Sequence, residues 1–211
     1  MPEVMKAVET PEVVDLEKEF AQMALDGMLS NGALRDIPFV NIAAGGVSVL
    51  LSVRDHFTKK KLMRFLAAFE GVSEWQRRDM VCRLQADASY NRKVGHHVIE
   101  LLDRIDSHRK PSMIGHAFVA YALKRINLTM LQRLITGIER LPSIEIDIVR
   151  KVCDAITHNR QDLKLIDPES TDAIISAGFA HASDGLSGGG LKITPTCSAF
   201  LDLELDRKSE S

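Results

Sequence analysis

Side chains that could bind a metal ion recur on one face of a helix predicted near the middle of the chain. His96, Glu100 and Asp103 follow one another at i, i+4 and i+7, a spacing that brings side chains onto one side of an α-helix. Zinc accepts imidazole and carboxylate ligands. A solvated polar stripe has the same spacing, and the chain has neither a His-Glu-x-x-His segment nor a close pair of cysteines. We therefore prefer the stripe and predict no metal ligands; the opposite, apolar face consists of Val98, Leu101, Leu102 and Ile105.

Nucleophilic and phosphate-transfer motifs are not predicted. The glycine-rich stretch around Ser187 lies in a predicted hairpin, whereas the serine of a hydrolase nucleophile elbow stands between a strand and a helix. No Walker sequence or dinucleotide fingerprint occurs, so no glycine-rich loop opens a helix to hold phosphate. Carboxylates such as Asp106, Glu139 and Asp154 are scattered as on ordinary helix surfaces. We therefore predict a protein that is not an enzyme, without catalytic residues and without a cofactor.

Positive charge is concentrated in one basic patch within residues 54–78. A helix face at i, i+3, i+4 and i+7, from Leu62 to Phe69, is apolar, so the lysines stand where an amphipathic helix carries its solvated charges. The patch could instead contact a polyanion such as nucleic acid. Because the formal net charge is −2, the surface as a whole is not built to neutralise phosphate, and we disfavour nucleic-acid binding. The patch consists of Arg54, Lys59, Lys60, Lys61, Arg64, Arg77 and Arg78.

A long uncharged segment, Ile37–Val53, raises the question of a membrane. Its 17 residues span about 25 Å as a helix, less than the roughly 30 Å hydrocarbon core of a bilayer. A helix buried on all sides of a bundle has the same composition, with glycines that permit close helix contact. We favour the buried helix and keep a membrane-inserting effector as an alternative. The residues of interest are Phe39, Val40, Gly45, Gly46, Val47, Leu50 and Leu51.

Apolar periodicity predicts that residues 1–157 form a bundle of about seven helices. Thr10-Pro11-Glu12 has the N-cap, proline and acid of a helix start. Ser73 with Gln76 predicts a capping box, and Gly71 before it can close the preceding helix in the left-handed conformation. Short connections favour antiparallel neighbours.

The sequence of residues 158–206 predicts a smaller α+β unit. Residues 207–211 are expected to form a disordered tail. Asp167-Pro168 and Thr194-Pro195 each combine a cap with a first-turn proline. Between the two helix starts, glycines separate short apolar runs, which is typical of a β-hairpin. The predicted fold class is mainly α, a multi-helix bundle with this small unit at the C-terminus.

This C-terminal unit resembles the closing half of a winged-helix unit. The resemblance rests on Asp172–Phe179, on the glycine-rich hairpin, and on Leu191–Thr194 with Phe200-Leu201. Phe179 replaces the usual leucine, and Cys197 stands where a glycine is common. A winged helix implies DNA binding, which we disfavour because the chain has no Lys or Arg between Lys164 and Lys192 while Asp167, Glu169, Asp172 and Asp184 are acidic. The resemblance therefore implies a structural or protein-binding role.

A second resemblance concerns the segment from Arg54 to Leu62, with Phe65-Leu66 after it. This segment is similar to uncharacterised helical proteins of bacteria and their phages. The similarity implies no activity.

The three cysteines, Cys82, Cys153 and Cys197, are an odd number at wide spacing. This pattern predicts neither a disulfide framework nor a zinc site and fits a reducing compartment. The first thirty residues are rich in acids and show no secretion signal. We expect a cytoplasmic protein.

These observations favour a non-enzymatic protein–protein interaction or regulatory protein of bacterial or phage type. A protein partner or self-association is expected. The alternatives are a nucleic-acid-binding regulator that uses Lys59–Arg78 and a membrane-active effector that uses Ile37–Val53; we disfavour both contacts.

Overall fold

A computed structural model describes residues 55–87, 94–157, 167–183 and 190–205. The segment Ile37–Val53, with all of its named residues, lies outside these ranges, and so do Arg54, residues 158–166 and residues 206–211. The predicted domain boundary after residue 157 adjoins one of these gaps and stays a prediction. Within the described ranges, no helix has the length and apolar character that crossing a bilayer requires.

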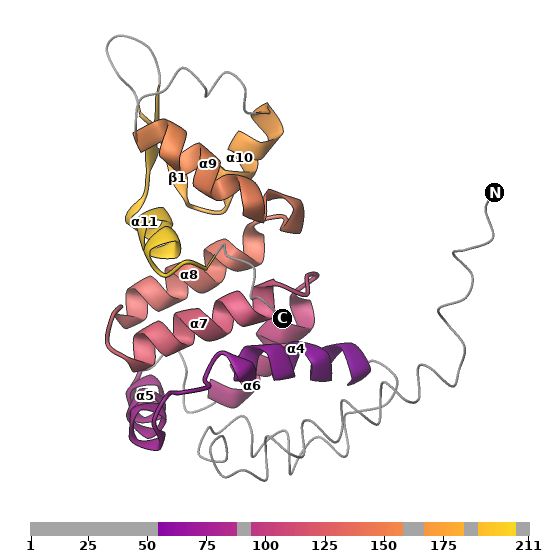
Figure 1. The fold of residues 1–211 in the computed structure, drawn as a ribbon, viewed down its shortest axis with the longest axis vertical. Coiled ribbons are helices and arrows are strands. Elements are labelled where there is room, and N and C mark those ends of the chain that lie inside the picture. The colour runs from indigo at the N-terminus through magenta and orange to yellow at the C-terminus, as the bar shows by residue number, and fades with distance from the viewer. Residues whose placement is uncertain (1–54, 88–93, 158–166, 184–189, 206–211) are drawn as a thin grey trace, which may run out of the picture. The chain divides into compact units, whose positions relative to one another are not determined.

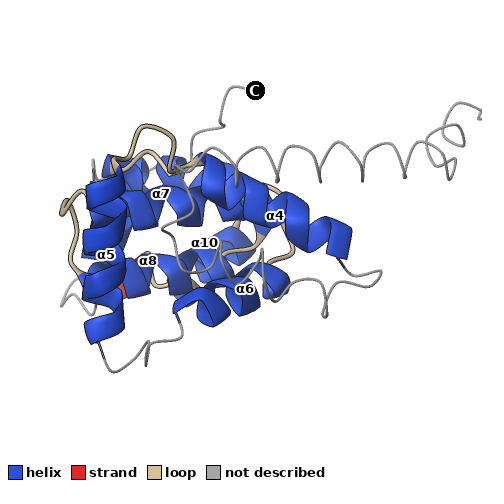
Figure 2. Ribbon diagram, turned by 90° about the horizontal axis from the view of Figure 1, so that it is seen from below, coloured by secondary structure: helices blue, strands red, loops and turns tan. Residues whose placement is uncertain are grey.

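The described residues form eight α-helices and one two-stranded sheet (Figures 1 and 2). They fall into two compact units: unit 1 holds residues 55–64, 72–87 and 94–103, and unit 2 holds residues 65–71 and 104–205 apart from the gaps. The prediction of a mainly helical fold with a small hairpin near the C-terminus is confirmed.

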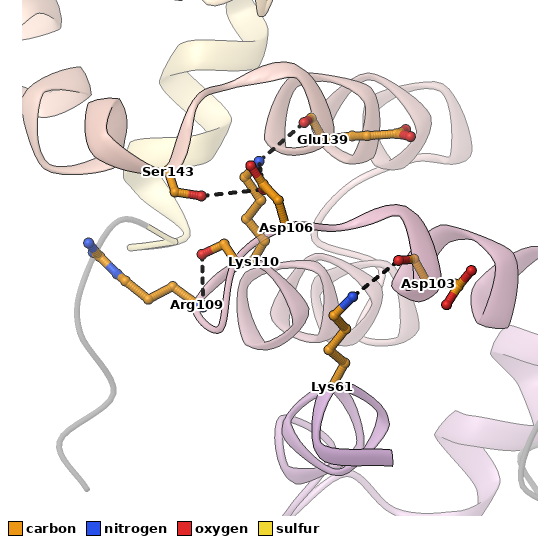
Figure 3. A network of polar contacts seen from close by, with 8 residues as sticks. Lys61, Asp103, Asp106, Arg109, Lys110, Glu139 and Ser143 are labelled. Atoms are coloured by element: carbon orange, nitrogen blue, oxygen red, sulfur yellow. Dashed lines mark hydrogen bonds and ion pairs between the residues drawn. The ribbon is translucent and has the colours of Figure 1, made fainter. Parts of the chain in front are cut away.

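Unit 1 contains the start of α4 (Asp55–Ala67), α5 (Glu74–Ala86) and most of α6 (Val94–Arg104). The predicted capping box is present, because Ser73 Oγ accepts from the Gln76 N–H while the Gln76 side chain accepts from the Ser73 N–H. Lys61 Nζ on α4 donates to the Asp103 carbonyl oxygen on α6 at 3.1 Å (Figure 3). The core side chains of unit 1 are Leu62, Val72, Met80, Val81, Leu84, Val98, Leu101 and Leu102.

Unit 2 is built around α7 (Lys110–Ala122), which is apolar on most of its surface and largely buried. It lies alongside α8 (Leu128–Arg140) (Figure 1). A 3₁₀ turn, η1 (Ser143–Glu145), leads into α9 (Ile146–Thr157), followed by α10 (Pro168–Ser176). Strands β1 (Ala180–Ser183) and β2 (Gly190–Ile193) pair antiparallel, with Ala180 opposite Ile193, before α11 (Pro195–Asp202) packs on α8.

Close backbone approach holds the end of α4 against α7. Gly71, at φ +80°, ends this stretch in the left-handed conformation, as predicted. A Cβ atom at Gly115 would lie 2.5 Å from the Phe65 carbonyl oxygen, so only glycine fits here. The ring of Phe65 packs edge-on against Phe118, with centroids 5.5 Å apart.

A buried lysine joins the start of α7 to the end of α8. The Lys110 side chain is 3% exposed, and its Nζ donates to Asp106 Oδ1 at 3.0 Å and to the Glu139 carbonyl oxygen at 3.2 Å (Figure 3). Ser143 Oγ donates to the same Asp106 oxygen. The hydrogen bond from Lys110 lowers the pKa of Asp106, aided by the positive charge of the ammonium group. Asp106 and the backbone of Glu139 are therefore structural.

The sulfur atoms of Cys153 in α9 and Cys197 in α11 are bonded, which corrects our expectation of a chain without disulfides. Sequence spacing could not reveal the pair because the two residues are 44 positions apart. Their Cα atoms lie 7.4 Å apart, beyond the roughly 4.4–6.8 Å of most disulfides. Cys82 is free and exposed.

Loss of the Asp106 carboxylate should weaken unit 2 in a pH-dependent way. Asp106→Asn should lower the free energy of unfolding at pH 7 by less than about 1 kcal/mol, because the buried ammonium loses its charged acceptor but the exposed carboxylate is screened by solvent. The folded-state pKa of Asp106 lies below that of the unfolded chain. Its contribution is therefore complete above about pH 4 and disappears as the pH falls through the folded-state pKa. Urea unfolding at several pH values measures this, with exposed Asp172→Asn as the control; an equal cost at pH 7 and at low pH would contradict the assignment.

Reduction of the disulfide should destabilise the protein. Cross-linking residues 44 positions apart restricts the unfolded chain by about 2–4 kcal/mol, and we expect the lower part of this range because of the long Cα separation. Urea unfolding followed by circular dichroism, with and without dithiothreitol, should show this loss. Cys153→Ser should reproduce it in the absence of reductant, whereas Cys82→Ser should not. Three reactive thiols in the unreduced protein would refute the linkage.

Candidate functional site

Unit 2 contains a cavity of about 600 Å³ between α8 and the elements that follow α10. We call it the α8–α11 cavity. The α8 wall consists of Thr129, Gln132, Arg133, Thr136 and Arg140. The opposite wall consists of Ala177 and Gly178 in the turn after α10, and of Thr194, Pro195 and Thr196 at the start of α11.

The residues of the α8 wall follow the periodicity of the helix. Thr129, Arg133, Thr136 and Arg140 stand at i, i+4, i+7 and i+11, so they form one stripe along the helix. The other side of α8 is held in the core by side chains with no exposed surface: Leu131, Leu134 and Ile138. Asn127 caps this helix by accepting a hydrogen bond from the Met130 N–H at 2.9 Å.

Glycine sets the distance between the two walls. A Cβ atom at Gly137 would lie 2.9 Å from the Phe179 ring and 3.0 Å from the Ala177 carbonyl oxygen. The turn itself needs Gly178, at φ +79°, and the Phe179 N–H donates back to the Ile174 carbonyl oxygen. The absence of a side chain at Gly137 therefore lets this turn pack directly on α8.

Thr194 joins the turn to α11. Its N–H donates to the Phe179 carbonyl oxygen at 2.9 Å, and its Oγ1 donates to the Gly178 carbonyl oxygen at 2.7 Å. The same hydroxyl accepts from the Cys197 N–H at 3.2 Å as the N-cap of α11. The predicted Thr194-Pro195 helix start is confirmed, and it fixes the second wall of the cavity.

Positive charge in the α8–α11 cavity is not neutralised by its own walls. No Asp or Glu is among the described residues that line it. Arg133 and Arg140 form no ion pair within the part of the chain that the structure describes. Two other arginines of unit 2 do have acidic partners: Arg104 pairs with Glu139 at 2.9 Å and Arg109 with Asp147 at 2.8 Å. The cavity therefore carries two positive charges that suit an anion.

The start of α11 adds polar groups without partners. Pro195 has no N–H, while the N–H groups of Cys197 and Ser198 donate to Thr194. Only the Thr196 N–H remains in this first turn, because helix geometry offers it no carbonyl partner. The side chain of Thr196 is buried, and its hydroxyl makes no hydrogen bond with the described residues. Both donors belong to a residue that lines the cavity.

Several side chains of the predicted basic patch form hydrogen bonds or ion pairs with other groups of the protein. Arg77 is 5% exposed and donates to the Val72 carbonyl oxygen. Arg78 pairs with Glu74 at 2.7 Å, and Lys61 donates to Asp103. Lys60 is half-buried and Arg64 is exposed; Arg54 and the side chain of Lys59 lie outside the description. Polyanion contact through this patch stays a prediction.

The predicted polar stripe of α6 is only partly described. Glu100 and Asp103 are exposed, and Asp103 accepts a hydrogen bond from Thr58 at 3.3 Å, while the side chain of His96 lies outside the description. No set of three His, Cys, Asp or Glu side chains among the described residues is arranged to hold a metal ion.

Sequence reasoning missed the α8–α11 cavity, although one signal for it was present. The stripe from Thr129 to Arg140 contains two arginines and no acid, but we used α8 only for its apolar periodicity. The opposing wall lies about forty to seventy residues further along the chain, where spacing gives no information on contact.

Comparisons with family models, curated proteins and solved structures find no match for this chain. Its function must therefore be argued from the geometry and charge of the site.

Enlarging the side chain at position 137 should push the two cavity walls apart. We expect Gly137→Ala to lower the free energy of unfolding by about 1–3 kcal/mol, because the new methyl group overlaps the Phe179 ring. Ser176→Ala, at an exposed position of α10, is the control and should change stability by less than about 0.5 kcal/mol. Urea unfolding measures both variants; a Gly137→Ala protein as stable as wild type would mean that the walls are not in contact.

Proposed function

We propose that this protein is a non-enzymatic interaction protein that binds an anionic group of a protein partner in the α8–α11 cavity. The uncompensated charge of Arg133 and Arg140 is the observation that carries the proposal. Two guanidinium groups without an acidic partner in the wall are satisfied when a ligand supplies the negative charge. The bacterial or phage origin and the cytoplasmic location expected from the sequence remain part of the proposal, but the Cys153–Cys197 bond removes the cysteine pattern as support for a reducing compartment.

The character of the lining favours a group on a larger partner over an enclosed small molecule. Small-molecule pockets are lined mainly by apolar and aromatic side chains, whereas seven of the ten residues that line this cavity have polar side chains and none is aromatic. Both arginines are exposed, and arginine is enriched at the energetic centres of protein interfaces.

We also propose that α10, β1, β2 and α11, which lie within the predicted unit of residues 158–206, form a winged-helix type of unit used for protein contact. The order of helices and hairpin supports this, as do the contacts of α10 with β1 and of α11 with β2. Exposed Glu169 and Asp172 on α10 would repel DNA. Two unpaired arginines are also few beside the roughly 6–10 phosphate contacts of a DNA-binding surface.

Charge reversal in the cavity should abolish partner binding. We expect the double variant Arg133→Glu/Arg140→Glu to lose a captured partner by about a hundredfold, because two charge-assisted contacts become repulsive. Full-length wild-type and variant proteins serve as baits in native lysate, and captured proteins are quantified by mass spectrometry.

The matched control is Arg125→Glu/Lys151→Glu, which makes the same change in net charge at exposed positions of unit 2 outside the cavity. It should retain the partner that the cavity variant loses. Identical captured proteins for all three baits would refute the proposed function.

A further inference from the structure

The α8–α11 cavity combines donors from two directions. Arg133 and Arg140 are seven residues apart on one helix face, so their Cα atoms are separated by about 10 Å along the axis. Long side chains at this spacing can reach a group that lies between them. The Thr196 N–H and hydroxyl come from the opposite wall, at the positive end of the α11 dipole.

We infer that the anionic group bound here is a phosphate monoester dianion, carried by a phosphorylated side chain of the partner. This inference rests on the proposed function. A carboxylate has one negative charge and two oxygens, and a single arginine satisfies both oxygens with two parallel hydrogen bonds. It would leave the second guanidinium of this cavity uncompensated.

A phosphate monoester matches the cavity in both charge and number of acceptors. Its charge near −2 balances Arg133 and Arg140, and its three terminal oxygens accept from donors on both sides. One oxygen then remains for the Thr196 N–H and hydroxyl. Backbone N–H groups at a helix start, with nearby hydroxyls, are a recurrent arrangement for phosphate.

Burial of Thr196 is the second observation that points to a ligand. The residue is 6% exposed and lines the cavity, and its hydroxyl has no hydrogen-bond partner among the described residues. Its oxygen is not shut off from the cavity, so it can form a hydrogen bond with a bound group. A bound phosphate oxygen would supply that partner.

Phenyl phosphate and benzoate, added to the ¹⁵N-labelled full-length protein, separate the two chemistries. We expect phenyl phosphate to produce saturable NMR shifts of the Thr196 amide and of the Arg133 and Arg140 Nε–H groups, with at least tenfold tighter binding than benzoate. Binding should tighten about tenfold from pH 5 to pH 7.5, as the monoester becomes a dianion with its second pKa near 6. Benzoate binding as tightly as phenyl phosphate would overturn the inference.

Variants test whether the cavity is responsible. Arg133→Gln/Arg140→Gln should abolish the saturable shifts, Thr196→Val should weaken binding severalfold, and Arg125→Gln/Lys151→Gln should change neither. Equal shifts in the cavity variant and in wild type would identify an adventitious ion only and overturn the inference.

Phosphatase treatment of the lysate distinguishes failure of this inference from failure of the proposed function. We expect the treatment to remove the partner captured by the wild-type bait. If the partner persists after phosphatase but is lost with Arg133→Glu/Arg140→Glu, the phosphate inference fails and the interaction function stands. If phenyl phosphate binds but all baits capture the same proteins, the proposed function fails, and the phosphorylated partner fails with it.

Discussion

The absence of a side chain at Gly137 in α8 determines how unit 2 is assembled. At Gly137 the backbone of α8 comes so near to the Phe179 ring that a methyl group would overlap it. The turn after α10 therefore packs directly on the helix, and Thr194 then ties α11 to that turn through its hydroxyl and its N–H. The cavity between the two walls follows from this packing, because the arginines flank the glycine on the same helix.

The buried ammonium of Lys110 holds the same C-terminal end of α8. A charge removed from water is tolerated only with partners, and Lys110 has a carboxylate at 3.0 Å and the carbonyl oxygen of Glu139 at 3.2 Å. That carbonyl lies in the last turn of α8, where the helix dipole favours a cation. The α7–α8 pair is therefore fixed by a polar contact at one end, while apolar packing extends along its length.

Local features of this fold could be predicted from sequence, whereas contacts between distant segments could not. Apolar periodicity located the described helices, and the caps at Ser73 and Thr194 are as expected, because each depends on residues within one or two turns. The Cys153–Cys197 bond, the burial of Lys110 and the cavity depend on segments tens of residues apart. Spacing carries no such information, and the arginines of α8 looked like ordinary surface charges until an opposing wall was known.

One atom, Thr194 Oγ1, contributes both to the folding of unit 2 and to its proposed binding surface. It caps α11 and holds the turn after α10, and these two contacts also form one wall of the cavity. A homologue that no longer binds the ligand would still need this hydroxyl to fold, whereas substitutions of Arg133 and Arg140 would no longer be selected against. Among homologues, retention of the threonine together with both arginines would therefore mark the members that still bind, and retention of the threonine by itself would mark those that merely fold.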